Sequence, residues 1–255
     1  MPNPVSIAIT GTNGRMGRAL QTLLADDPRF MLAASIARED DWRDAPKLDV
    51  VIDFSTPEGF DAALAHCESH GVALVVGTTG LDAAQREHFD AAAAKIPVLY
   101  AANFSLGIAV LTRLLRDAVS ALPEWDLEIV EAHHARKVDA PSGTALALGR
   151  AAANARGQKF DDVAVFGRHG HTGARETGAI GFASIRAGDI VGEHTVLLVG
   201  HDERIELTHR AFDNAIFARG ALTAAAWLVG RNAGRYDLDD MLAEAKSTLS
   251  ANERK

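Results

Sequence analysis

The stretch SIAITGTNGRMG, residues 6–17, decides the fold. Ser6–Thr10 is a short apolar run that ends directly at Gly11, and Met16–Leu24 has the spacing of an amphipathic helix. A strand, a glycine turn and a helix in this order are typical of a loop that binds a dinucleotide, because glycines let the backbone approach the pyrophosphate and the first helical N–H groups favour an anion. The spacing is G-x-x-G-x-x-G instead of G-x-G-x-x-G, and we expect Asn13 to accept left-handed backbone in place of a glycine. An ordinary strand-to-helix turn is the alternative interpretation.

Apolar runs and helix-like segments alternate along the N-terminal part of the chain. The runs with strand character are Met31–Ile36, Val50–Phe54, Val72–Val76 and Val98–Ala101, and the segments with helix character are Pro57–His70 and Asp82–Lys95. This alternation predicts an α/β fold with a Rossmann-like, doubly wound parallel sheet. The segment Ala37–Asp49 is short for a crossover helix, so we expect an abbreviated connection there.

The pattern changes after Asn103. A helix over Leu106–Ala121 precedes a strand over Leu127–Glu131 and a helix over Thr144–Arg156, and the strands expected next are Val163–Gly167, Ala179–Arg186, Glu193–Val199 and Arg204–Thr208. Successive strands without helices predict a second α+β domain with a mixed or antiparallel sheet. The helices expected at Asn214–Val229 and Leu238–Leu249 can return to the first domain. We therefore expect a dinucleotide-binding domain over residues 1–104 and 214–255, and a substrate-binding and oligomerisation domain over 105–213.

Composition narrows the class of protein. The 255 residues carry a formal net charge of −8, which argues against general affinity for nucleic acid. The longest apolar stretch, Ala221–Val229, is too short to span a bilayer. Cys67 is the single cysteine and no signal peptide is recognisable, so we expect a reducing, cytoplasmic setting.

The end of the second predicted strand bears on the choice of dinucleotide. An acidic residue there would bind the ribose 2′-hydroxyl of NAD, whereas an arginine accommodates a 2′-phosphate. The sequence has Ala37, Arg38 and Glu39 at this point, and Arg15 can reach the same region. The lack of an acid at position 37 favours NADPH, while Glu39 keeps NADH possible and Arg38 can equally be a solvated surface charge.

Two further loops follow parallel strands. Gly77-Thr78-Thr79-Gly80 and Ala101-Ala102-Asn103-Phe104 both lie where ligands bind in open α/β sheets, outside the carboxyl ends of the strands. They can line the nicotinamide and its ribose, although each can also be an ordinary turn.

The segment EAHHARKVDAPSGTA, residues 131–145, contains the densest chemistry in the chain. His133 and His134 can exchange a proton near neutral pH, and Lys137 can hold a carboxylate or assist protonation. Ser142 or Thr144 can cap the following helix, and the N–H groups of Gly143 and Thr144 can then meet an anion. The segment predicts a site for a small dicarboxylate.

Less specific interpretations of the histidines stay open. Adjacent residues on a strand face opposite sides, so either His133 or His134 can be a core residue. Adjacent histidines lack the usual spacing of metal ligands, as does the pair His169 and His171, and we expect no metal. The two loop histidines, with Arg168 and Arg175, can instead cover the substrate.

With these motifs, the sequence resembles the 4-hydroxy-tetrahydrodipicolinate reductases, also called dihydrodipicolinate reductases, of lysine and diaminopimelate biosynthesis. The resemblance covers essentially the whole chain and is carried by GTNGRMGR, DFSTPEG, VVGTTG, AANFSLG, EAHHARKVDAPSGTA and GFASIRAGDIVGEHTV. It implies a Rossmann-like domain completed by the C-terminal helices, and an inserted substrate domain whose sheet builds a homotetramer. The histidine-lysine segment is the most specific of the motifs.

The resemblance also implies roles for individual residues. His133 would donate the proton with Lys137 assisting, while hydride passes from NADPH or NADH to C4 of the substrate and the hydroxyl leaves as water. The residues implied to hold the substrate carboxylates are His134, Lys137, Gly143 and Thr144. Those implied to contact the cofactor are Gly11, Thr12, Asn13, Gly14, Arg15, Met16, Arg38, Gly77, Thr78, Thr79, Ala101, Ala102, Asn103 and Phe104.

Ala37 departs from the family pattern, in which an acidic residue is frequent, and this puts balanced use of NADH in doubt. Two other interpretations compete. Another Rossmann reductase, such as a semialdehyde or amino-acid dehydrogenase, would need a catalytic cysteine or a different set of charged residues, and Cys67 lies in a predicted helix interior away from the strand ends. An NADPH-sensing binding protein would not need both His133 and Lys137. The domains are expected to hinge at Asn103–Ser105 and Phe212–Asn214.

Overall fold

The computed structural model describes residues 3–37 and 42–244. They form two compact units. The first unit contains the described residues up to Leu106 and those from Ala215 onward, and the second contains Gly107–Asn214. Within the described ranges, no helix is both long enough and apolar enough to cross a membrane.

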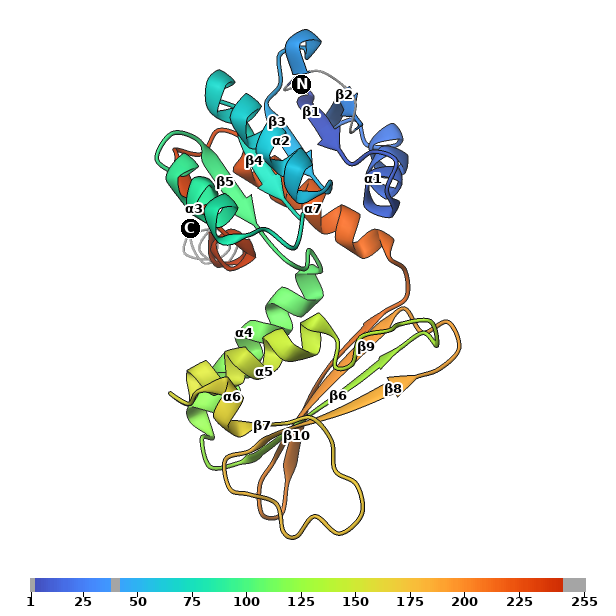
Figure 1. Ribbon diagram of the computed structural model, residues 1–255, viewed down its shortest axis with the longest axis vertical. Coiled ribbons are helices and arrows are strands. Elements are labelled where there is room, and N and C mark those ends of the chain that lie inside the picture. Colours follow the sequence, from blue (N-terminus) through green and yellow to red (C-terminus); the bar gives the residue numbers. More distant parts are fainter. Residues whose placement is uncertain (1–2, 38–41, 245–255) are drawn as a thin grey trace, which may run out of the picture. The chain divides into compact units, whose positions relative to one another are not determined.

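The first unit is built on a parallel sheet whose described strands follow the order β11-β5-β4-β3-β1-β2, of which β1 to β5 are labelled in Figure 1. The strands are β1 (Val5–Thr10), β2 (Phe30–Ile36), β3 (Val50–Asp53), β4 (Ala73–Val76), β5 (Pro97–Tyr100) and β11 (Gly234–Tyr236). The central strands β3 and β4 are buried at every residue, as expected when helices cover both faces of a sheet. The predicted Rossmann-like sheet is confirmed.

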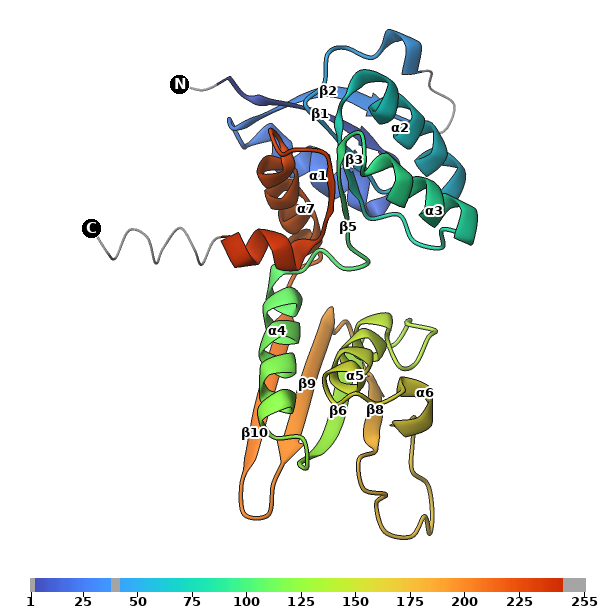
Figure 2. The same ribbon diagram turned by 90° about the vertical axis from the view of Figure 1, so that its left-hand side faces the viewer.

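Helices cover both faces of this sheet. Helices α1 (Arg15–Ala25) and α7 (Ala215–Leu228) lie on one face, and α2 (Pro57–His70) and α3 (Ala83–Ala92) lie on the other (Figure 2). Local sequence sets their ends, since Pro57 occupies the first turn of α2 and Gly71 ends it in left-handed conformation. The described part of the connection between β2 and β3 contains one 3-10 turn, η1 (Trp42–Asp44). A further helix occupies residues 238–244.

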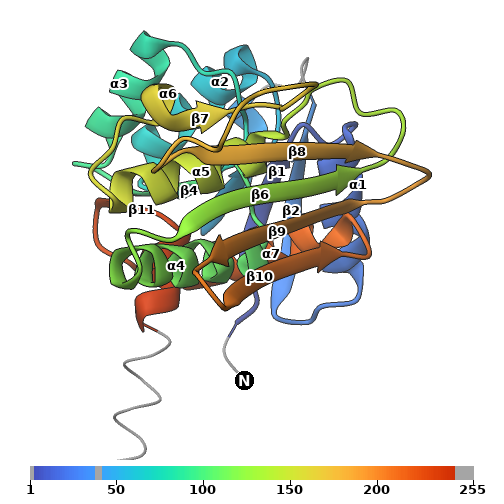
Figure 3. The same ribbon diagram turned by 90° about the horizontal axis from the view of Figure 1, so that it is seen from below.

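The second unit has a mixed sheet in the order β10-β9-β6-β8-β7 (Figure 3). Its strands are β6 (Asp126–His133), β7 (Ala164–Val165), β8 (Ile180–Arg186), β9 (Gly192–Val199) and β10 (Arg204–Ala211), and its helices are α4 (Leu106–Ala121), α5 (Gly143–Ala155) and α6 (Phe160–Val163). Strand β9 is antiparallel to β6 and β10, whereas β8 is parallel to β6. Helices α4 and α5 pack on one face, around Leu115, Leu127 and Ile129.

Two local expectations are wrong, and one strand was not anticipated. Every described non-glycine residue has a negative φ, so Asn13 is not left-handed; Gly11 takes that conformation instead, with φ +71°. The strand expected over Val163–Gly167 is the short helix α6 followed by two strand residues, because Phe160 turns back to pack against Phe182. The edge strand β11 was not expected, since three residues are too few to show a period.

Gly17 permits the close approach of α1 to the loop after β1. A Cβ at this position would lie 2.4 Å from the carbonyl oxygen of Gly11 and 2.5 Å from Cα of Thr12, and both are backbone atoms. We expect Gly17→Ala to lower the free energy of unfolding by roughly 1–3 kcal/mol. Urea denaturation checks this. Thr22→Ala, at an exposed position of the same helix, is the matched control and should change stability by less than about 0.5 kcal/mol; equal effects of the two changes would contradict the packing argument.

Candidate active site

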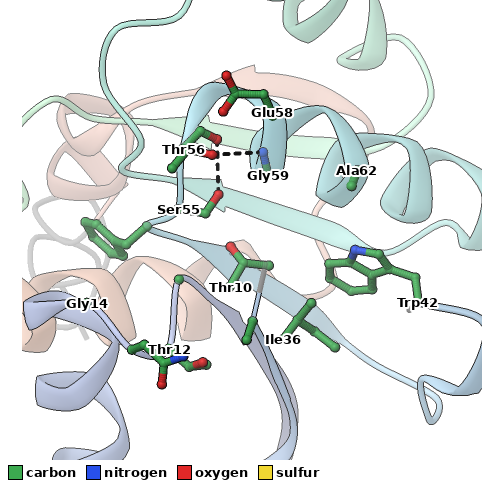
Figure 4. A pocket seen from close by; sticks show the side chains of 14 residues that line it. Thr10, Thr12, Gly14, Ile36, Trp42, Ser55, Thr56, Glu58, Gly59 and Ala62 are labelled. Atoms are coloured by element: carbon green, nitrogen blue, oxygen red, sulfur yellow. Dashed lines mark hydrogen bonds between the residues drawn. The ribbon is translucent and has the colours of Figure 1, made fainter. Parts of the chain in front are cut away.

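The glycine loop borders a cavity of about 420 Å³ at the carboxyl ends of β1, β2 and β3 (Figure 4). Its wall includes Gly11, Thr12, Asn13 and Gly14, four of the residues expected to contact a cofactor. Gly11 must be glycine, because its φ is +71° and a Cβ there would lie 2.1 Å from the carbonyl oxygen of Phe54. Backbone therefore comes closest where a pyrophosphate would need it.

The N-terminus of α1 is suited to an anion. Its N-cap is Gly14, and no side chain caps the first turn. The positive end of the helix dipole therefore faces the loop without a competing carboxylate or hydroxyl. Arg15 and Met16 are the first two residues of α1 and do not line the cavity. Arg38 lies outside the described residues.

The two other loops that the sequence predicts to contact a cofactor do not line this cavity, but pack against Phe54 and Ser55, which do. A Cβ at Gly77 would overlap the ring of Phe54, 2.1 Å from Cε1. Thr78 is buried, and its Oγ1 accepts a hydrogen bond from the backbone N–H of Ser55 at 2.9 Å. Phe104 is also buried and meets Phe54 edge to face at 5.4 Å. Thr79, Ala101, Ala102 and Asn103 lie in the same loops.

A buried carboxylate fixes the floor of the cavity. Asp53, at the end of β3, is fully buried, and its Oδ1 accepts hydrogen bonds from the hydroxyls of Thr10 and Ser55 and from the Ser55 N–H. Thr10 is the register partner of Asp53 in the adjacent strand. Thr10 and Ser55 both line the cavity, and Asp53 therefore fixes their hydroxyls beside the loop before α2.

Sequence reasoning did not identify the other end of this cavity. Ile36, Trp42 and Ala62 line it there (Figure 4). Ala62 lies in α2, just after the DFSTPEG motif, and this motif was the sequence signal that could have placed α2 beside the cavity. Trp42 is brought in by the turn η1, which no periodicity in the sequence predicts.

The histidine segment folds around Glu131 in the second unit. Glu131 and His133 lie on the same face of β6, and the side chain of Glu131 is 1% exposed. Its two carboxylate oxygens accept hydrogen bonds from Arg186 on β8, at 2.8 and 2.7 Å. They also meet Nδ1 of His133 at 2.6 Å and the backbone N–H of Ser142 at 3.2 Å. One carboxylate thus joins two strands and the start of α5.

This network keeps Glu131 ionised. Burial on its own raises the pKa of Glu131, but hydrogen bonds from Arg186, Ser184 and His133 outweigh it and bring the pKa down to about 2. Because an ionised carboxylate can only accept, the proton of the 2.6 Å bond sits on Nδ1 of His133. Nε2 of His133 is the nitrogen left for a ligand.

The surroundings of His133 favour its neutral form between proton transfers. Burial lowers its pKa, and Lys137 and Arg186 act in the same direction, while Glu131 opposes them. Gly192 leaves space at Nε2, because a Cβ at that glycine would lie 3.1 Å from this nitrogen. His194 is edge-on to the His133 ring at 5.2 Å.

The start of α5 is held by a second histidine. Ser142 is the N-cap, and its Oγ accepts from the N–H of Ala145 at 3.1 Å. The same Oγ lies 3.0 Å from Nε2 of His194, whose pKa burial lowers to about 4. His194 is therefore neutral at physiological pH, and its Nε2 can accept a hydrogen bond from the Ser142 hydroxyl. Gly143 and Thr144 are the first two residues of α5, at the positive end of the helix dipole.

Lys137 and His134 lie in the turn that follows β6. The Lys137 ammonium pairs with Asp139 at 2.8 Å, and its backbone N–H donates to the carbonyl of His134 at 3.1 Å. Nδ1 of His134 is buried and makes no hydrogen bond in the described part of the chain. A buried ring nitrogen without a protein partner fits a residue that completes its hydrogen bonding on a ligand.

The loop expected to cover the substrate is bound elsewhere. Arg168 and Arg175 pair with Glu128 at 3.0 and 3.2 Å. Glu128 is five residues before His133 on the same strand, which corresponds to about 17 Å at roughly 3.3 Å per residue. The expectation that Arg168 and Arg175 cover the substrate beside His133 is therefore wrong, and the reason is this ion pair near the opposite end of β6.

Cys67 does not support a thiol mechanism. It is fully buried within α2, and burial raises the pKa of its thiol far above the usual range. Within residues 3–37 and 42–244, no group of three histidine, cysteine or acidic side chains is placed to hold a metal.

Ionisation of Glu131 links stability to pH. Its folded pKa of about 2 lies below the ordinary value, so it stabilises the fold above about pH 4.5, and this contribution disappears as the pH falls towards 2. We expect Glu131→Gln to lower the free energy of unfolding by roughly 3 kcal/mol at pH 7 and by progressively less below pH 4.5. Urea denaturation at several pH values measures this. Glu87→Gln, at an exposed position of α3, is the control; a pH-independent difference for Glu131→Gln would refute the linkage.

Two family models match the chain and together account for both units. Dihydrodipicolinate reductase, N-terminus, matches residues 5–104, and dihydrodipicolinate reductase, C-terminus, matches residues 107–242.

Curated relatives and a solved structure agree with these matches. The chain is 45% identical over 261 residues to the 4-hydroxy-tetrahydrodipicolinate reductase of Acinetobacter baumannii (strain AYE), covering 92% of this chain and 95% of the relative. It is 46% identical over 263 residues to that of Halorhodospira halophila, covering 93% and 98%. The fold is similar to that of a dipicolinate-bound dihydrodipicolinate reductase from Paenisporosarcina sp. TG-14, with a TM-score of 0.75 at 22% identity over 92% of this chain and 97% of the other. The chain therefore belongs to the dihydrodipicolinate reductase family.

Proposed function

We propose that this chain reduces 4-hydroxy-tetrahydrodipicolinate to tetrahydrodipicolinate, in lysine and diaminopimelate biosynthesis. One hydride from NADPH or NADH and one proton enter, and one water leaves, so the reaction balances as substrate, NAD(P)H and H⁺ giving product, NAD(P)⁺ and water. The observation that carries the proposal is the network around Glu131, which joins a proton-exchanging histidine to a helix N-terminus suited to a carboxylate. The relatives named above support the choice of substrate.

His133 is the proton donor in this proposal. Its Nδ1 is occupied by Glu131, so the Nε2–H bond of the imidazolium breaks and the proton passes to the substrate, while the C4 hydroxyl leaves as water. Lys137 assists by stabilising the negative charge that develops during hydride transfer. Afterwards His133 returns to the neutral form that its buried surroundings favour.

The carboxylates of the substrate are assigned to His134, Lys137, Gly143 and Thr144. The N–H groups at the start of α5 favour an anion, and the buried Nδ1 of His134 gains the hydrogen-bond partner that the protein does not provide. Lys137 must exchange Asp139 for the substrate. This exchange is inexpensive, because Asp139 is half-exposed and such a pair contributes about 0–1 kcal/mol.

We assign the dinucleotide to the cavity beside the glycine loop. When bound, its reduced nicotinamide supplies the hydride. The backbone from Gly11 to Gly14 and the uncapped start of α1 would hold the pyrophosphate. Arg15, Met16 and Arg38 and the loops Gly77–Thr79 and Ala101–Phe104 complete the proposed contacts. Ala37 lines the cavity without a carboxylate, which favours NADPH over NADH.

We further propose a cytoplasmic homotetramer that assembles through the second sheet. Helices α4 and α5 cover one face of this sheet, and no described helix of the unit covers the other (Figure 1). Leu197 and Ile185 are among the apolar residues of that uncovered face. Apolar side chains left open on a sheet are typical of an interface between chains. The unit 107–214 would then serve both substrate binding and assembly, and the rest of the chain would bind the cofactor.

The first prediction from the proposed function concerns turnover. We expect His133→Ala combined with Lys137→Ala to reduce kcat at least 100-fold, because it removes the proton donor and the adjacent cation. NADPH oxidation dependent on the dihydrodipicolinate-pathway substrate measures this, with circular dichroism to check folding. The matched control is His201→Ala with Lys159→Ala, two exposed positions of the same unit. Full activity of the first double variant would remove the proposed site.

The second prediction concerns cofactor choice. Ala37→Glu places a carboxylate where it can accept from a ribose 2′-hydroxyl and repel a 2′-phosphate. We expect the ratio of kcat/KM for NADPH to that for NADH to fall by roughly tenfold, equivalent to about 1.4 kcal/mol. Ala94→Glu, at an exposed position away from the cavity, adds the same charge and should leave the ratio unchanged. An unaltered ratio in Ala37→Glu would argue against the 2′-phosphate assignment.

The third prediction concerns assembly. Light scattering should give the wild-type protein the mass of four chains. Leu197→Arg should reduce that mass, because burying the charge in the interface would be unfavourable. Leu114→Arg, on the exposed side of α4, is the control and should keep the tetramer. A wild-type monomer would contradict the proposal.

A further inference from the structure

Glu131 is buried, and its ion-pair partner Arg186 is 19% exposed. Burying a carboxylate is costly, and a pair of apolar residues of similar size is often at least as stable. Here the contacts of the carboxylate are directed: two come from Arg186, and His133, Ser142 and Ser184 each supply one. Arg186 also donates to the carbonyl of Asp139 at 2.7 Å, which ties the same cluster to the turn that carries Lys137.

We propose that Glu131 and Arg186 are positioning residues for proton transfer, which rests on the function proposed above. The carboxylate, fixed by Arg186, keeps the proton of neutral His133 on Nδ1, so that Nε2 is always the nitrogen that exchanges a proton with the substrate. Neither residue needs to touch the substrate. Arg186 aligns the carboxylate, and the carboxylate aligns both the ring of His133 and the first turn of α5.

Among the charged groups around His133, Glu131 is the one that stabilises the imidazolium form. Lys137 and Arg186 face the ring from the following turn and from β8, and both disfavour the imidazolium. On β9, His194 is neutral near pH 7, and it is influenced in turn by His209 on β10. Glu131 is the anion paired directly with the ring, whereas Asp139 pairs with Lys137. Without the Glu131 charge, the proton donor would be deprotonated at lower pH.

The first test is a measurement of the His133 tautomer. In ¹⁵N-labelled protein, long-range ¹H–¹⁵N NMR should show wild-type His133 with its proton on Nδ1 when neutral. Glu131→Gln can donate as well as accept, so we expect a mixture of tautomers. Arg186→Lys keeps the charge but not the two parallel bonds, so we expect a tautomer mixture between those of the wild type and Glu131→Gln. This variant keeps the test available if Glu131→Gln does not fold. An unchanged single Nδ1–H tautomer in both variants would overturn the proposal.

The second test is the dependence of the rate on pH. We expect Glu131→Gln to lower kcat by roughly 10- to 100-fold, with the fall in activity at high pH moved to lower pH and a smaller change in KM. Glu87→Gln, at an exposed position of α3, should retain the wild-type profile. A loss of kcat without any shift of the profile would indicate only structural damage. If the wild-type protein fails to reduce the substrate, the proposed function is refuted, whereas the tautomer result stands independently.

A separate observation concerns the cavity of the first unit. Trp42 lines its apolar end, together with Ile36 and Ala62 (Figure 4). The indole is stacked on His66, with ring centroids 4.4 Å apart, and His66 is stacked in turn on His70 at 4.3 Å. Burial lowers the pKa of His66, so the ring behind Trp42 is neutral at physiological pH. The tryptophan is thus held from behind while its other atoms border the cavity.

We infer that Trp42 forms the wall against which the adenine of the dinucleotide packs, which also rests on the proposed function. The glycine loop at one end of the cavity suits phosphate, and the apolar end suits a planar base. A base against an indole ring contributes about 1–3 kcal/mol, as measured by alanine substitution in other proteins. The assignment makes Trp42 a cofactor-binding residue that this chain supplies through η1.

Calorimetric titration with ADP-ribose and with nicotinamide mononucleotide tests this assignment. We expect Trp42→Ala to weaken ADP-ribose binding by roughly 5- to 30-fold, Trp42→Phe to weaken it less, and neither to change the affinity for nicotinamide mononucleotide. Trp227→Phe, in α7 and outside the cavity, is the control. ADP-ribose should also quench wild-type tryptophan emission more than that of Trp42→Phe. Unchanged ADP-ribose affinity in both Trp42 variants would overturn the assignment, while a wild-type protein that binds neither ADP-ribose nor NADPH would refute the proposed cofactor itself.

Discussion

The hydrogen-bonded carboxylate of Glu131 is the interaction on which the second unit's site depends. It is buried and ionised, so each of its donors has to be in place for the fold to tolerate it. Those donors come from β6, β8 and the start of α5, segments separated by up to 55 residues. The same requirement that stabilises the charge therefore sets the ring of His133 and the N-terminus of α5 in fixed positions. The Glu131 carboxylate therefore both links the elements of the second unit and fixes the His133 ring.

The first unit uses close backbone contact for a comparable purpose. Gly11, Gly17 and Gly77 each lie where a Cβ would meet backbone or the Phe54 ring within 2.5 Å. The loops that end β1, β3 and β4 are therefore packed directly on one another, and Asp53 and Thr78 bond their polar groups. Little side-chain material separates the strand ends, which leaves the backbone of Gly11–Gly14 at the cavity wall. A phosphate-binding loop needs this kind of support, because its N–H groups must be held in place before the ligand arrives.

Much of the fold could be predicted because its signals are local. The run Val50–Phe54, which contains β3, and the helix expected over Pro57–His70 follow directly from the sequence, and both are confirmed. The failures have equally local reasons. Asn13 does not take left-handed backbone because Gly11 already makes the turn. The two-residue strand β7 and the three-residue strand β11 are stabilised by pairing with β8 and β5, which leaves no period in the sequence.

The sequence by itself determined the class of the two units, the dinucleotide loop and the histidine-lysine segment, because each depends on residues close together in the chain. Only the tertiary structure decided the partners. Arg186, His194 and Trp42 reach their positions through strand register and an irregular turn, and nothing near them in sequence marks them. Arg168 and Arg175 are the converse case, since their charge suggested a substrate contact and the strand start at Glu128 binds them instead. Long-range pairing, which a linear pattern does not encode, decides which side chains reach the two candidate sites.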